Sequence, residues 1–194
     1  MSTSTTPAQL VRSHDGREVP QAGEYAIDVS HSTVEFVVRH LMISKVRGRF
    51  GSYSGTVVVA DRPEDSSVEV SIDAASIDTN DEQRDGHLRG EDFFAADAFP
   101  ALTFKSTKVE AAKGDNWKVT GDLTIRDVTR PVVLDVEFEG AQVDPWGGAR
   151  LGFSASTEID REDWGLTWNQ ALETGGVLVG KKIKIELGVQ ATRS

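Results

Sequence analysis

The sequence predicts an all-β protein and favours a closed antiparallel barrel of about eight strands. Two observations lead to this prediction: apolar and polar residues alternate along most of the chain, and residues typical of turns separate the alternating segments. The alternation is clearest where Leu134, Val136 and Phe138 are interleaved with Asp135 and Glu137. Because successive side chains of a strand point to opposite faces, this pattern predicts a sheet with one buried and one solvated face.

The alternating segments follow an N-terminal stretch of different composition. Residues 1–22 are rich in Ser, Thr, Pro, Gly and charged residues, so we expect a flexible arm there and a single domain over 23–194. A closed barrel would have no exposed edges and could hold one small ligand, but a two-sheet sandwich would show the same alternation, so the pattern leaves closure open. The expected strands are 25–29, 33–40, 45–60, 68–72, 101–111, 119–125, 132–138, 151–155 and 183–189.

One segment interrupts the strand pattern. Asn80 or Asp81 is suited to cap a helix, and the pair Phe93-Phe94 follows some distance further on. We predict a short helical insertion near residues 81–97, which would lie over an end or a side of the barrel.

Composition excludes several classes of function. The 194 residues contain no cysteine, which excludes thiol nucleophiles, thiolate metal sites and disulfides. The formal net charge of -10 disfavours binding to nucleic acids and to anionic bilayers. No apolar run reaches the roughly 20 residues that span a membrane, and residues 1–20 lack the apolar core of a secretion signal. We therefore expect no stable membrane insertion and a cytoplasmic location.

The residues suited to chemistry form no familiar catalytic motif. The sequence contains no phosphate-binding glycine loop, nucleophile elbow or zincin helix. The candidates for acid–base or metal chemistry are His14, His31, His40 and His87, whose spacing does not favour a shared metal site. We expect structural histidines, with His31 hydrogen-bonded to nearby backbone, and neither a metal nor a cofactor.

Arginines beside acidic residues form a second pattern with two interpretations. We favour ion pairs that anchor irregular loops, because the guanidinium fork matches a carboxylate. The alternative is a cationic rim that meets the anionic head of a ligand. The residues concerned are Arg84-Asp85, Arg126-Asp127 with Arg130, and Arg161-Glu162-Asp163.

Short motifs occur in a characteristic order over residues 23–192. They are Tyr25-Ala26-Ile27-Asp28-Val29-Ser30-His31-Ser32, Val34-Glu35-Phe36, Val38-Arg39-His40-Leu41, Gly48-Arg49-Phe50, Arg84-Asp85-Gly86-His87-Leu88, Asp92-Phe93-Phe94, Phe99-Pro100, Gly121-Asp122-Leu123-Thr124-Ile125-Arg126 and Asp163-Trp164-Gly165-Leu166. This series resembles the YceI-like family. The chain departs from the family at Trp164, where Phe or Tyr is expected, and in lacking the secretion signal of many relatives.

The resemblance implies an extended eight-stranded, lipocalin-like antiparallel barrel, often a homodimer, with a tunnel for a long isoprenoid or similar lipid. It implies no catalytic residues, and we assign Arg84-Asp85 and Asp160-Arg161 to maintenance of the fold. Core packing is the alternative role for each aromatic residue. The residues expected to contact the lipid are Phe36, Val38, His40, Phe50, Phe93, Phe94, Phe104, Leu123, Ile125, Leu134, Val136, Phe138, Phe153 and Trp164.

Three functions remain open. The leading hypothesis is a protein that carries or sequesters polyprenyl chains, quinones or related lipids in the barrel. The second is an isomerase, cyclase or hydrolase that uses a polar group inside the barrel, with Glu35, Arg39 and His40 as the nearest candidates. The third is a filled barrel that serves as an interaction or stress-response module.

Overall fold

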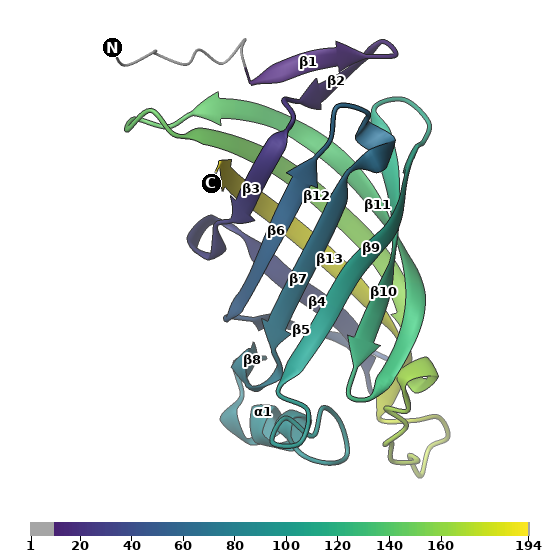
Figure 1. The fold of residues 1–194 in the computed structure, drawn as a ribbon. Coiled ribbons are helices and arrows are strands. Elements are labelled where there is room, and N and C mark those ends of the chain that lie inside the picture. The colour runs from purple at the N-terminus through teal and green to yellow at the C-terminus, as the bar shows by residue number, and fades with distance from the viewer. Residues whose placement is uncertain (1–9, 194) are drawn as a thin grey trace.

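The computed structural model describes residues 10–193 and shows a closed antiparallel barrel with one short helix (Figure 1). Eight strands form the barrel in the order β12-β11-β10-β9-β7-β6-β3-β13, and the pairing of β12 with β13 closes it. Closure rules out the two-sheet sandwich. The barrel strands are β3 (Gly23–Ile27), β6 (Tyr53–Val59), β7 (Ser67–Asp73), β9 (Ala101–Ala111), β10 (Asn116–Ile125), β11 (Val128–Val143), β12 (Ala149–Asp160) and β13 (Val179–Arg193).

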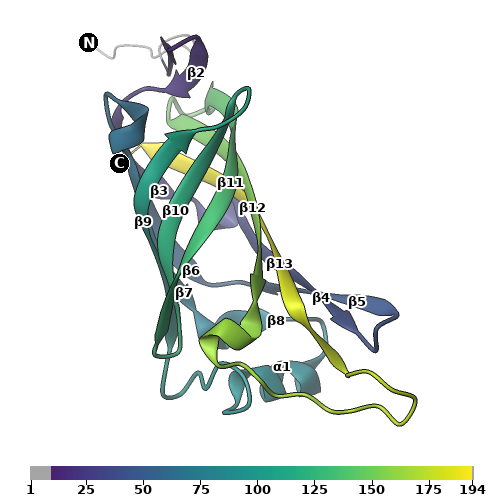
Figure 2. The ribbon, with the colours of Figure 1, turned by 90° about the vertical axis from the view of Figure 1, so that its right-hand side faces the viewer.

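The long strand β13 joins the barrel to a second group of strands. Its last residues pair with β3, and the residues before them pair with β4 (Thr33–His40). β3 and β4 therefore follow each other along one edge of β13, separated by the 3-10 turn η2 (Val29–His31). β4 turns into β5 (Ser44–Phe50), which pairs with the short β8 (Ile77–Asp78). The hairpin of β4 and β5, here called the flap, projects away from the barrel (Figure 2).

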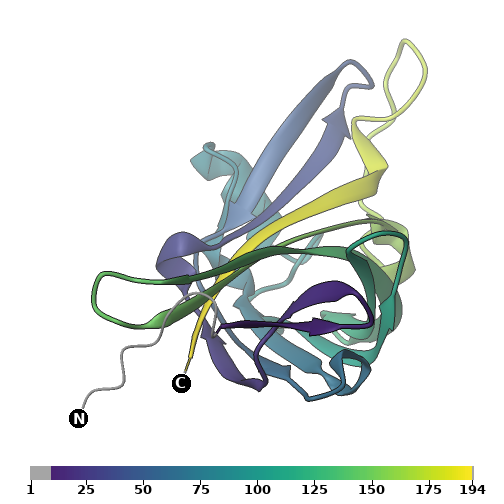
Figure 3. The same cartoon turned by 90° about the horizontal axis from the view of Figure 1, so that it is seen from above.

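The described part of the N-terminal segment, where we expect a flexible arm, contains regular secondary structure. It forms a hairpin of β1 (Val11–His14) and β2 (Arg17–Pro20), which lies across one end of the barrel, the upper end (Figure 3). Leu10 and Val19 are only 1% and 2% exposed, so this hairpin buries an apolar face despite its polar composition. Residues 1–9 lie outside the described part of the chain.

The predicted helical insertion is present at the opposite, lower end. α1 (Glu82–Arg89) begins after Asp81, whose carboxylate accepts a hydrogen bond from the Arg84 amide at 2.9 Å. The Arg84 side chain donates to the Thr79 carbonyl at 2.8 Å, and the Thr79 amide donates to Asp85 at 2.9 Å. Arg84 and Asp85 therefore anchor the helix through Thr79 and not through an ion pair with each other. No helix within residues 10–193 is long and apolar enough to cross a membrane.

The buried side chains form two separate groups. The larger group lies toward the lower end and includes Phe50, Leu123 and Trp164. The smaller group lies toward the upper end, around Tyr25 and Leu151. The packed core is therefore divided and does not run continuously through the barrel.

Candidate ligand-binding cavity

The barrel interior holds a cavity of about 360 Å³, and side chains from each of its strands line it. On β11 the residues Val132, Leu134 and Val136 line the cavity, whereas Asp135 binds Lys118 at 2.7 Å on the solvated face. The volume falls within the roughly 300–1,000 Å³ of small-molecule sites. The structure thus contradicts a barrel filled by its own side chains.

Most of the residues predicted as lipid contacts line this cavity, and His40 and Trp164 do not. Trp164 is 3% exposed and its indole Nε1 donates to the Leu123 carbonyl at 2.9 Å, so it belongs to the lower core. His40 ends β4, where it pairs with Ser44 and Val179. Contact with a ligand stays a prediction for the predicted residues that do line the cavity: Phe36, Val38, Phe50, Phe93, Phe94, Phe104, Leu123, Ile125, Leu134, Val136, Phe138 and Phe153.

Sequence reasoning missed residues that close the cavity at its upper end. Val19 and Pro20 of β2 line the cavity there, although their segment was expected to be a flexible arm. One signal in the sequence could have found the hairpin. Asp15-Gly16 is a preferred pair for a two-residue hairpin turn, and both residues have the positive φ that such a turn requires.

Two glycines, one in the flap and one in the barrel, allow large aromatic rings to lie close against a neighbouring strand. Gly48 is the cross-strand partner of Phe36, and a methyl group at Gly48 would collide with the Phe36 ring. A methyl group at Gly121 would collide with the Phe104 ring in the same way. The rings therefore cover glycine backbone on the neighbouring strand, an arrangement known from designed sheets. This placement keeps two large side chains close to the wall and leaves the interior open.

The charged side chains along the cavity are bound to other groups of the protein. Arg161 is 5% exposed and donates to the carbonyls of Gly180 and Leu166 at 2.9 and 2.5 Å. Burial lowers the pKa of its guanidinium. The Glu35 carboxylate accepts a hydrogen bond from the half-exposed Arg47 at 3.2 Å. Both side chains are therefore engaged with groups of the protein.

The residues considered for catalysis do not converge in the cavity. Arg39 and His40 are absent from its lining, and the carboxylate of Glu35 is engaged as just described. Acid–base chemistry needs a titratable group that faces the substrate and a second group within hydrogen-bond reach. These three residues supply no such pair.

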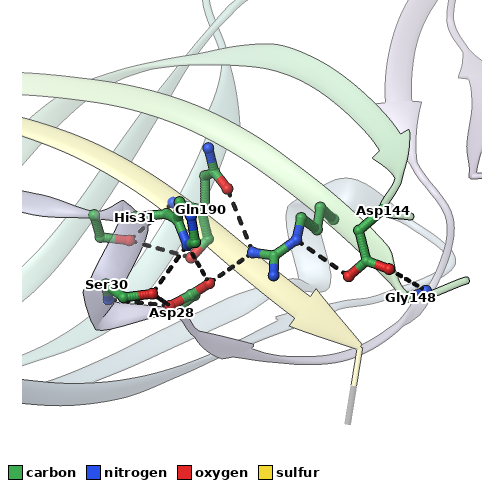
Figure 4. A network of polar contacts seen from close by, with 8 residues as sticks. Asp28, Ser30, His31, Asp144, Gly148 and Gln190 are labelled. Atoms are coloured by element: carbon green, nitrogen blue, oxygen red, sulfur yellow. Dashed lines mark hydrogen bonds and ion pairs between the residues drawn. The ribbon is translucent and has the colours of Figure 1, made fainter. Parts of the chain in front are cut away.

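A polar network lies at the upper end, outside the cavity lining, and connects η2 with β12 (Figure 4). Asp28 Oδ2 accepts a hydrogen bond from Arg150 at 2.6 Å and lies 2.8 Å from His31 Nδ1. Asp28 Oδ1 accepts from the Ser30 hydroxyl at 2.6 Å, and Arg150 also donates to Asp144 at 3.3 Å. The hydrogen bonds from Ser30, then Arg150 and His31, hold the pKa of Asp28 well below its usual range.

The side chains of His31 and His87 contact other side chains, and among the described residues His31 does not make the expected side-chain bond to the backbone. His31 Nδ1 lies near the Asp28 carboxylate and also 2.9 Å from the Ser30 hydroxyl. A Ser–His–Asp relay needs serine and carboxylate on opposite ring nitrogens, so this cluster is not a relay. His87 Nε2 lies 2.9 Å from Asp92. Within residues 10–193 no three metal-binding side chains group together.

Related proteins share both sequence and fold with this chain. A UPF0312 protein of Staphylococcus aureus is 39% identical over 169 residues, which cover 86% of this chain and 95% of the relative. Among solved structures, the YceI protein of Campylobacter jejuni is 32% identical with a TM-score of 0.68, covering 80% of this chain and 90% of that protein.

Two more distant structures support the fold alone. BcnA of Burkholderia cenocepacia has a TM-score of 0.74 at 24% identity, over 84% of this chain and 98% of that one. A polyisoprenoid-binding domain from Saccharophagus degradans has a TM-score of 0.65 at 15% identity, over 90% of this chain and 100% of that one.

A known domain family accounts for the barrel and for the flap. The YceI-like domain matches residues 25–191, a range that contains α1 and the flap and takes in most of every barrel strand. The match leaves out the β1–β2 hairpin. From this match and from the identity to the staphylococcal relative, the chain belongs to the YceI-like domain family.

Proposed function

We propose that the protein binds a long apolar chain of the isoprenoid type, such as a polyprenyl chain or a quinone tail, inside the barrel and carries or sequesters it. The observation that supports this proposal is the cavity of about 360 Å³, whose lining is almost entirely apolar along the length of the barrel. Water in such a space would lack hydrogen-bond partners, which favours an apolar occupant.

The energetics of burial are sufficient for such a ligand. Each buried methylene contributes about 0.8 kcal/mol, so a ten-carbon stretch gains roughly 8 kcal/mol before the cost of ordering the chain. Because Arg161 and Glu35 are engaged with protein groups, selectivity would depend on the length and width of the chain more than on its head group. The polyisoprenoid-binding domain of Saccharophagus degradans supports the proposal, since it has this fold.

We favour binding over catalysis because a reaction would need polar groups aimed at the ligand. Glu35, Arg39 and His40 do not provide them. The remaining charged residue of the lining, Arg161, is held by backbone carbonyls.

The first test is mass spectrometry of lipids extracted from the purified protein, followed by titration of emptied protein with geranylgeraniol and longer polyprenols. Trp117 lines the cavity and is 7% exposed, so its fluorescence should report the occupant. The proposal would be contradicted if repeated preparations contained no lipid and the protein bound none of these probes.

A cavity-filling variant tests whether the ligand binds inside the barrel. Ala155 lines the cavity, and its neighbour Ser156 alternates to the opposite face of β12. We expect Ala155→Phe to weaken polyprenol binding by about tenfold or more, because the ring displaces about two methylenes of ligand. Ser156→Phe is the matched control and should bind as the unmodified protein does. Equal affinities for both variants would place the ligand outside the barrel.

A further inference from the structure

The tip of the flap carries a run of exposed apolar residues. Leu41, Met42 and Ile43 connect β4 to β5 and are 38%, 53% and 84% exposed. Three consecutive exposed apolar side chains are a defect on a soluble surface unless they have a partner. The tip of the flap lies away from the barrel, beside the loop that precedes β13, as Figures 2 and 3 both show.

The backbone of this tip does not explain the choice of residues. Leu41 and Met42 have φ values of 53° and 63°, and the Ile43 amide donates to the His40 carbonyl at 3.2 Å. Both residues therefore have the left-handed φ that glycine and asparagine adopt most readily and that bulky side chains disfavour. Large apolar residues therefore occupy two positions where they favour neither the turn nor the core.

Positive charge flanks the tip. Residues 36–60 contain four basic residues, Arg39, Lys45, Arg47 and Arg49, and no acidic residue. Arg39 and Lys45 are direct cross-strand neighbours next to the tip. The ion pairs of the flap within residues 10–193 involve Arg47 and Arg49, and none involves Arg39 or Lys45. Since like charges directly opposite each other destabilise a strand pair, this arrangement favours an anionic partner from outside.

We propose that the tip docks on a bilayer that contains anionic phospholipids, with Leu41, Met42 and Ile43 in the interface and Arg39 and Lys45 at the headgroups. Apolar side chains combined with cations are what holds peripheral proteins at such surfaces. The net charge of -10 disfavours contact between the surface as a whole and an anionic bilayer, but its effect at the tip is small, because charges more than about 8 Å away are largely screened at physiological salt. A second copy is a poorer partner for this face, because the same cations would meet.

Docking would also bring the cavity close to the bilayer. Val38 lines the cavity three residues before Leu41, and Val179 lines it as the register partner of His40. A lipid would then have a short path between the bilayer and the cavity. The docking proposal goes beyond the proposed function and does not depend on it, since a bilayer surface can be bound with the cavity empty.

The test is flotation of the full chain with vesicles of phosphatidylcholine, either pure or mixed with phosphatidylglycerol. We expect binding to the mixed vesicles that weakens as salt rises. Ile43→Asp should reduce the apparent affinity at least tenfold, and Arg39→Gln and Lys45→Gln about fivefold each. Trp146→Asp is the matched control, because Trp146 is 87% exposed in another hairpin turn. That variant should bind the vesicles normally.

A second variant separates docking from folding. Leu41→Asn combined with Met42→Gly places residues that tolerate positive φ at the two positions, so the melting temperature should rise or hold while vesicle binding falls at least tenfold. The proposal is overturned by absent binding to mixed vesicles, by equal loss in Trp146→Asp, or by a dimer that Ile43→Asp disrupts without any vesicle binding. Flotation does not measure lipid in the cavity and extraction does not measure docking, so the two proposals fail separately.

Discussion

The two ends of the barrel are closed by the same kind of hydrogen bond in different surroundings. At the lower end, Arg161 is buried and donates to carbonyls of the segment that leads into β13. At the upper end, Arg12 and Arg17 tie the β1–β2 hairpin to the barrel, donating to the carbonyls of Ala60 and Ala112 at 2.7 Å. The latter arginines are only partly buried, so water can replace their bonds.

Because Arg161 is buried and Arg12 and Arg17 are not, we expect the lower end to be held more firmly than the upper end. A buried carbonyl that loses its donor keeps the full cost of its lost solvation, whereas an exposed one regains water. The ends also differ in chemistry. At the upper end the Asp28 carboxylate accepts a hydrogen bond from the charged Arg150, whereas at the lower end Arg161 donates to carbonyls and the buried Asp85 carboxylate accepts from Thr79.

The largest effect is expected at Arg161. Arg161→Ala would leave the carbonyls of Gly180, Leu166 and Trp168 without their donor, so we expect the free energy of unfolding to fall by about 3 kcal/mol or more. Hydrogen exchange in residues 165–179 should rise as well. Urea denaturation measures the loss, and Arg17→Ala, expected to cost about 1 kcal/mol, is the comparison. Equal losses would show that burial is not what distinguishes the two ends.

A smaller effect is expected when the upper hairpin is released. Val19→Asp places a charge at a side chain that is 2% exposed, so β1 and β2 should detach at a cost of about 2 kcal/mol. Hydrogen exchange should rise in the hairpin and remain unchanged in α1. If a polyprenol is bound, its release should accelerate, because Val19 closes the upper end of the cavity.

The control for this variant is Ser13→Lys, which adds a charge on the exposed face of β1, opposite Glu18. It should leave both exchange and release unchanged. Exchange that rises throughout the barrel in Val19→Asp would show that the hairpin belongs to the cooperative core, in conflict with the comparison.

Much of the barrel could be predicted because alternation is a local property. Residues 33–40 and 101–111 are strands with the predicted bounds. The segment 45–60 was predicted as one strand, but the chain breaks it at Gly51 and sends β5 to the flap and β6 to the barrel. Periodicity does not encode which strands pair, because pairing depends on contacts between segments that are distant in the sequence. The same holds for the edge of β13, which pairs with β3 over one part and with β4 over another.

The cavity walls were predicted for the same reason, since inward positions recur every second residue. The residues that close the two ends of the cavity could not be predicted in this way, because they depend on how the β1–β2 hairpin and α1 pack across the barrel. The arginines show the limit most clearly. Arg84 and Arg161 anchor irregular segments as predicted, yet they do so through backbone carbonyls and not through the expected ion pairs. The sequence does not reveal which backbone carbonyls an irregular loop leaves without a hydrogen-bond partner, so these acceptors could not be predicted.

The smallest effect expected concerns Asp28 and tests the chemical difference between the ends. Hydrogen bonds from Ser30 and Arg150 lower the pKa of Asp28 in the folded protein below its value in the unfolded chain. Its contribution to stability is therefore complete above about pH 4 and is lost as the pH falls through the folded pKa. Asp28→Asn should lower the free energy of unfolding at neutral pH by about 1 kcal/mol.

Below about pH 4, the same variant should lose stability less steeply than the unmodified protein, because the titrating carboxylate is gone. Urea denaturation at neutral pH and at successively lower pH values measures both slopes. Asp135→Asn is the matched control, since this carboxylate binds only the exposed Lys118 in the described part of the chain. Parallel slopes for Asp28→Asn and the unmodified protein would mean that the hydrogen bonds to Asp28 do not make the folded protein sensitive to acid.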